Sequence, residues 1–119
     1  MKSAVALFLL ASLFVLASVA AWAHAILLES TPAVRGRVAA GPGLVTLRFN
    51  ARIDRDRSRL TLIAPDKTQT RLPIVGSGTA DMLVATATVP PGDYVVRWQV
   101  LAVDGHITRG DVPFSVAAP

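Results

Sequence analysis

The 119-residue sequence contains no cysteine. It therefore has no disulfide to stabilise a fold and no thiolate to act as a nucleophile or metal ligand. Histidine and methionine are scarce as well, with two of each, and one methionine is Met1. A Ser-His-Asp catalytic set or a thioether-rich metal site therefore has few residues to draw on.

Excess charge of one sign is also small. The chain has 12 basic and 8 acidic residues, and without Lys2 the part from His24 onward has 11 against 8, a net charge of +3. Basic and acidic residues alternate, most clearly in 52–59 (RIDRDRSR), so nucleic acid is not an expected partner. We interpret 52–59 as a solvated turn, with a docking surface for a protein or acidic lipid as the alternative.

A long apolar run occurs only near the amino end, at residues 4–17. Lys2 precedes it, and Ala21 and Ala23 fit the small-x-small rule for signal peptidase. The pattern predicts a signal peptide over 1–23 and a mature domain over 24–119 that begins with His24. An uncleaved membrane anchor is the alternative, because the run approaches the length of a bilayer span.

From His24 onward no apolar pattern with a helical period is sustained, and short alternating segments dominate. Tyr94 and Trp98 share one face of the clearest segment, which predicts packing between two sheets. Pro113 predicts an edge position or a bulge. The expected strands include residues 45–49, 60–62, 82–89, 94–100 and 112–116. About seven short strands with frequent turns predict one all-β domain, an antiparallel β-sandwich.

The sequence Asp104-Gly105-His106 lies between the last two predicted strands. Residues two apart project to the same side of an extended segment, so Asp104 and His106 can converge on one ion. Gly105 permits an unusual turn there. Asp-Gly is also a common turn pair, so an ordinary surface turn is the alternative reading.

Cleavage after Ala23 would make His24 the first residue. Its α-amine and imidazole Nδ1 could then chelate one metal ion, and the amine loses its proton at about pH 7.7–8.0. Together with Asp104 and His106 this gives a nitrogen-rich set completed by oxygen. Such a set suits Cu(II) best, ahead of Ni(II) and Zn(II), so we expect one Cu(II) per chain.

The sequence resembles the CopC-like periplasmic copper-resistance proteins. The likeness is carried by 24–33 (HAILLESTPA), 45–50 (VTLRFN), 92–98 (GDYVVRW), 103–110 (VDGHITRG) and 114–116 (FSV). It implies a Greek-key β-sandwich of cupredoxin-like topology that binds one Cu(II). The ligands it implies are the amine and imidazole of His24, the carboxylate of Asp104 and the imidazole of His106.

Two positions depart from this family pattern. Ala51 stands where many members have a glutamate near the metal, so that acidic contact is absent. The methionine-rich Cu(I) segment of some members is missing too, since Met82 is the single methionine after Met1. Glu29 is either a distant support for the site or a solvent-facing residue.

These residues predict a monomeric, periplasmic Cu(II) carrier or buffer in copper resistance or homeostasis, with a CopD-type membrane protein as partner. No catalytic set is apparent, so an enzyme is not expected. One alternative is an oxidative copper enzyme with an N-terminal histidine brace, in which Asp104 would fill a position that oxygen needs. The other is a metal-free interaction domain.

Overall fold

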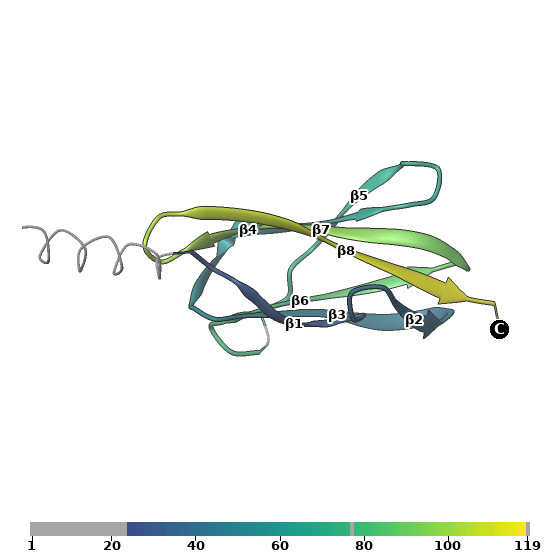
Figure 1. Cartoon of the computed structure of the whole chain (residues 1–119), viewed down its shortest axis with the longest axis horizontal. Helices are drawn as coiled ribbons and strands as arrows, with labels where there is room; N and C mark the ends of the chain where they lie inside the picture. The colour runs from purple at the N-terminus through teal and green to yellow at the C-terminus, as the bar shows by residue number, and fades with distance from the viewer. Residues whose placement is uncertain (1–23, 77, 119) are drawn as a thin grey trace, which may run out of the picture.

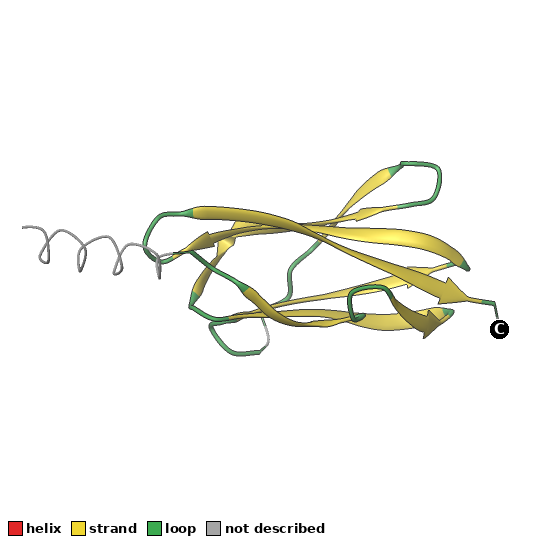
Figure 2. Ribbon diagram, viewed as in Figure 1, coloured by secondary structure: helices red, strands yellow, loops and turns green. Residues whose placement is uncertain are grey.

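The computed structural model describes residues 24–76 and 78–118, and these form eight strands in two packed sheets (Figures 1 and 2). The strands are β1 (Leu27–Thr31), β2 (Gly36–Ala39), β3 (Gly41–Phe49), β4 (Ile53–Ile63), β5 (Gln69–Leu72), β6 (Met82–Val89), β7 (Gly92–Ala102) and β8 (Ile107–Ala117). Among the described residues no helix is long and apolar enough to cross a membrane. The predicted signal peptide lies outside them.

One sheet has three strands in the order β1-β3-β6, and the other has five in the order β2-β8-β7-β4-β5. All paired strands are antiparallel except β2 and β8, which run parallel. The prediction of an all-β sandwich is confirmed, with eight strands in place of about seven. The parallel β2–β8 pair was not predicted from the sequence.

The core between the sheets follows from the alternation of apolar residues in the longer strands. Tyr94, Val96, Trp98 and Val100 of β7 are all buried, as expected for one inward face. The indole of Trp98 meets the ring of Phe49 edge to face, with centroids 5.1 Å apart, and so joins the two sheets. The core roles predicted for Tyr94 and Trp98 are confirmed.

The edge position or bulge predicted for Pro113 is wrong, because β8 lies inside its sheet between β2 and β7 and pairs with β7 without a bulge. Pro113 is tolerated because β2 pairs only with residues from Phe114 onward. Its carbonyl accepts a hydrogen bond from the backbone N–H of Arg35 at 2.6 Å. Its nitrogen points to the same side, beyond the start of β2, where the ladder needs no donor.

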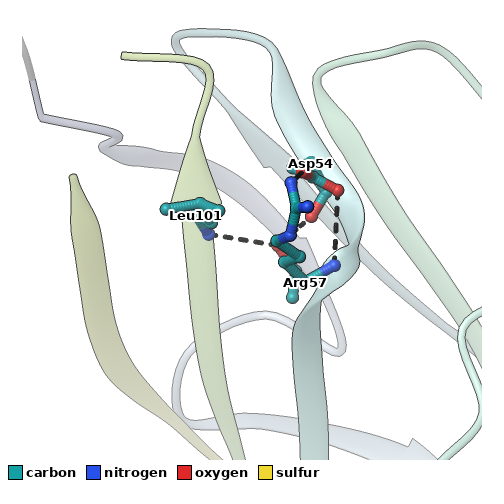
Figure 3. A network of polar contacts seen from close by, with 4 residues as sticks. Asp54, Arg57 and Leu101 are labelled. Atoms are coloured by element: carbon teal, nitrogen blue, oxygen red, sulfur yellow. Dashed lines mark hydrogen bonds and ion pairs between the residues drawn. The ribbon is translucent and has the colours of Figure 1, made fainter. Parts of the chain in front are cut away.

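The turn predicted over residues 52–59 is also wrong, since β4 begins at Ile53. The pairing of β4 with β7 is nevertheless irregular between Asp54 and Arg59. Figure 3 shows how the irregular segment is held: Arg57 donates to the Asp54 carboxylate at 2.9 Å, and the Ser58 hydroxyl donates to the Asp54 carbonyl at 2.6 Å. The backbone N–H of Leu101 on β7 in turn donates to that hydroxyl at 3.1 Å. A bulge in a strand thus takes the place of the expected turn.

Candidate metal centre

The connection from β7 to β8 is a tight turn that carries Asp104 and His106. The N–H of Gly105 donates to the Ala102 carbonyl, and the N–H of Ala102 donates to the His106 carbonyl, both at 2.9 Å. Gly105 has a φ of 90°, a conformation that side chains disfavour. The role predicted for Gly105 is confirmed: it permits the turn that brings its two neighbours together.

Asp104 and His106 are in direct contact. The Asp104 carboxylate accepts the backbone N–H of His106 at 3.1 Å and lies 3.1 Å from its Nδ1 atom. These contacts lower the pKa of Asp104, with the backbone hydrogen bond as the largest cause and the His106 side chain as a further one. The two side chains lie next to each other as expected, but a turn brings them together rather than strand alternation.

His24 is held in place by the residues that follow it. Ala25 is buried in the core, with 1% of its surface exposed. The N–H of Ile26 donates to Asn50 Oδ1 at 2.7 Å, and the N–H of Asn50 donates to the Ile26 carbonyl at 3.0 Å. Asn50, at the end of β3, therefore fixes the backbone two residues from His24.

The two histidines meet at one end of the sandwich. Their ring centroids are 5.1 Å apart, with the planes at 72°. A metal ion about 2 Å from one nitrogen of each ring would lie about 3 Å from each centroid, so two ligating rings can be up to about 6 Å apart. The spacing of His24 and His106 therefore fits two ligands of one ion. The His106 side chain is also 54% exposed, so an ion could reach it.

Within residues 24–76 and 78–118, no three histidine, cysteine or acidic side chains are gathered closely enough to hold a metal ion. The predicted ligands make pairwise contacts instead, His24 with His106 and His106 with Asp104. The expected set also needs the α-amine of His24. That atom is a peptide nitrogen while Ala23 precedes it, so the unprocessed chain lacks one donor.

Other residues near this end have structural partners. Glu29 is paired with Arg48 at 3.1 Å and its side chain is 74% exposed, which supports the solvent-facing alternative. Ala51 is half-buried beside Asn50 and offers no ligand atom. Sequence reasoning missed the anchoring role of Asn50, because its partner Ile26 is 24 residues away.

Comparison with known proteins places this fold. The CopC domain family matches residues 27–117, a segment that includes Asp104 and His106 and starts three residues after His24. Protein YobA from Escherichia coli K12 is 34% identical over 99 residues, which is 80% of each chain.

Two solved structures share the architecture. CopC from Methylosinus trichosporium OB3b is 28% identical with a TM-score of 0.73, over 80% of this chain and 95% of that one. PcoC, a methionine-rich copper resistance protein from Escherichia coli, matches with a TM-score of 0.65 over 80% of this chain and all of that one; at 22% identity this shows a shared fold. The resemblance seen in the sequence is confirmed: the chain belongs to the CopC family.

Proposed function

We propose that this protein is exported to the periplasm and, after loss of residues 1–23, binds one Cu(II) as a monomeric carrier or buffer in copper resistance or homeostasis. The observation that supports this most is the 5.1 Å approach of the His24 and His106 rings, with Asp104 against His106. The copper resistance named for the structural relative PcoC agrees with it.

In this proposal each ligand has a distinct role. His24 supplies its free amine and Nδ1, which close one chelate ring. His106 supplies one imidazole nitrogen. Asp104 keeps one oxygen on the backbone N–H of His106, which leaves the other to exchange its contact with Nδ1 for the ion.

We propose a carrier rather than an enzyme because the His106 side chain is exposed and because of the donor groups expected in the site. Two imidazoles, an amine and a carboxylate complete a tetragonal Cu(II) set and are selective for it by the Irving–Williams order. Delivery then needs an acceptor, for which we propose a CopD-type membrane protein.

Replacement of His106 is the direct test of the site. Mature protein that begins at His24 should bind one equivalent of Cu(II) with a tetragonal, nitrogen-rich EPR spectrum. Mutation of a residue that only hydrogen-bonds to a metal ligand lowers metal affinity about 10–100-fold. His106→Ala removes a proposed ligand itself, so it should lower the Cu(II) affinity by at least about 100-fold. Glu29→Gln, which removes a carboxylate paired with Arg48, is the control and should bind normally. Wild-type affinity and spectrum in His106→Ala would refute the site.

Acid should release the copper through the nitrogen donors. The two imidazoles and the amine take up protons in competition with the ion, because a nitrogen binds a metal only through its unprotonated form. The pKa of Asp104 is lowered by the N–H of His106, so its carboxylate stays ionised until a more acidic pH. At a pH low enough for all three nitrogens to be protonated in the metal-free protein, the logarithm of the Cu(II) Kd should therefore change by about three per pH unit. Asp104→Asn should weaken binding without changing that slope; a shallower slope would show that Asp104 titrates in this range.

A further inference from the structure

Large apolar side chains are exposed around the proposed copper site. Ile26 is 57% exposed, Val103 69% and Ile107 53%. Ile26 lies two residues after His24, Val103 directly precedes Asp104, and Ile107 directly follows His106. We call Ile26, Val103 and Ile107 the apolar collar.

The collar residues belong to two segments that meet at one end of the molecule. Figure 1 shows the start of the described chain and the β7–β8 turn at the same end of the sandwich, opposite the C-terminus. The contact between the rings of His24 and His106 joins these two segments. Both are ordered by backbone hydrogen bonds, Ile26 through Asn50 and Ile107 through its register with Leu101 of β7. The apolar side chains are thus presented on a rigid frame.

The three collar residues contribute little to the packing of the described domain, because more than half of the surface of each is exposed. Val103 is the most exposed large apolar residue of the described chain. Single scattered apolar residues are normal on a protein surface, whereas neighbouring exposed apolar residues mark interaction sites. We infer that the apolar collar is the docking surface for the protein that takes up the copper, an inference that rests on the proposed function.

The exposed area of the collar and the charge of Asp104 indicate which partner fits best: a second copy of this chain, a bilayer or an acceptor protein. Three half-exposed side chains present on the order of 300 Å², whereas a stable dimer buries about 800 Å² per partner. A second copy of this chain is therefore a poor fit, and a brief encounter with an acceptor is a good one. A bilayer is also a poor fit, because the Asp104 carboxylate lies within the collar and would have to leave water.

The acceptor is then a protein that presents imidazole nitrogens inside an apolar rim of its own. Ligand exchange proceeds as an acceptor nitrogen bonds to Cu(II) and a bond to His24 breaks. The freed amine takes a proton from solvent, the ion stays Cu(II), and no electron moves. Exclusion of water by the collar would favour exchange between the two proteins over loss of the ion to solvent.

The double variant Val103→Thr/Ile107→Thr tests this, because threonine keeps the branch at Cβ and replaces one apolar group on it by a hydroxyl. Its Cu(II) affinity, its EPR spectrum and its rate of copper loss to EDTA should match those of wild type. Transfer to a CopD-type protein in proteoliposomes should slow about tenfold or more. Leu44→Thr, at a residue of β3 that is 58% exposed and lies outside the collar, is the matched control and should transfer normally.

Several results would overturn the inference. These are wild-type transfer by the double variant, an equal slowing toward EDTA, a dimer that the variant loses, or collar-dependent binding to protein-free vesicles. Association of copper-free protein with the proteoliposomes is measured in parallel and should also weaken in the double variant. A wild-type protein that binds no Cu(II) would refute the proposed function. The role of the collar would still be decided by whether the copper-free double variant binds the proteoliposomes less than copper-free wild type does.

Discussion

A single residue placed before His24 is expected to abolish tight Cu(II) binding while the β-sandwich stays folded. The extra residue converts the α-amine into a peptide nitrogen, which ends the chelate and leaves the imidazole as a single donor. Loss of a residue that only hydrogen-bonds to a metal ligand lowers metal affinity about 10–100-fold. Loss of the amine donor and its chelate ring should therefore lower the Cu(II) affinity well over 100-fold. His106→Ala removes one donor without breaking a chelate, so its effect should be smaller.

The comparison needs two forms of the mature protein, one that starts at His24 and one that starts at Ala23. Cu(II) titration followed by EPR gives affinity and donor set, and thermal unfolding shows that both forms are folded. A form with one residue added after Pro119 is the control and should bind as the His24 form does. Equal binding by the two amino-terminal forms would rule out the proposed chelate.

This result would make copper binding depend on processing. Ala25 is buried and Ile26 is fixed by Asn50, so His24 is held beside His106 by residues that follow it in the chain. Cleavage would then add the amine to a site whose imidazoles are already close together. We expect mass spectrometry of the exported protein to find His24 as its first residue.

Much of the sandwich could be predicted because its core residues alternate strictly. Residues 94–100 of β7 show this best, and their predicted inward face is the buried one. Local rules failed where a tertiary contact decided the outcome. Ser58 bonds to Leu101, which is 43 residues away, and so holds residues 53–59 as a bulged strand where charge alternation suggested a turn. Likewise, β2 pairs with β8 only from Phe114 onward, so Pro113 can lie in a strand inside the sheet. The sequence does not show where β2 begins to pair.

The contact between Asp104 and His106 could be predicted from the sequence, whereas the residues that hold His24 in place could not. Asp104 and His106 are two residues apart, so their contact follows from local geometry once Gly105 permits the turn. Asn50 is 24 residues from Ile26, and no local pattern connects the two. Only the pairing of β1 with β3 brings them together. Residues that position a ligand from another strand therefore require the fold to be known.

Gly110 is a second position that only the fold reveals. It lies opposite Trp98 in the β7–β8 pair, and the indole covers its Cα. A Cβ at this position would lie 2.6 Å from Cε2 and 2.9 Å from Nε1 of Trp98, and closer still to Cζ2. Trp98 also packs edge to face against Phe49, so a shift of the indole would disturb the contact between the sheets.

We therefore expect Gly110→Ala to destabilise the domain by about 3 kcal/mol, at the upper end for overpacked cores. For a domain of this size the Tm would fall by on the order of 15 °C in calorimetry. Gly43→Ala is the control: nothing lies within 4 Å of a Cβ there, so its effect should stay within about 1 kcal/mol. In a Trp98→Leu background, which lacks all three clashing atoms, Gly110→Ala should cost much less. An equal cost in both backgrounds would show that backbone strain, and not the indole, requires glycine at this position.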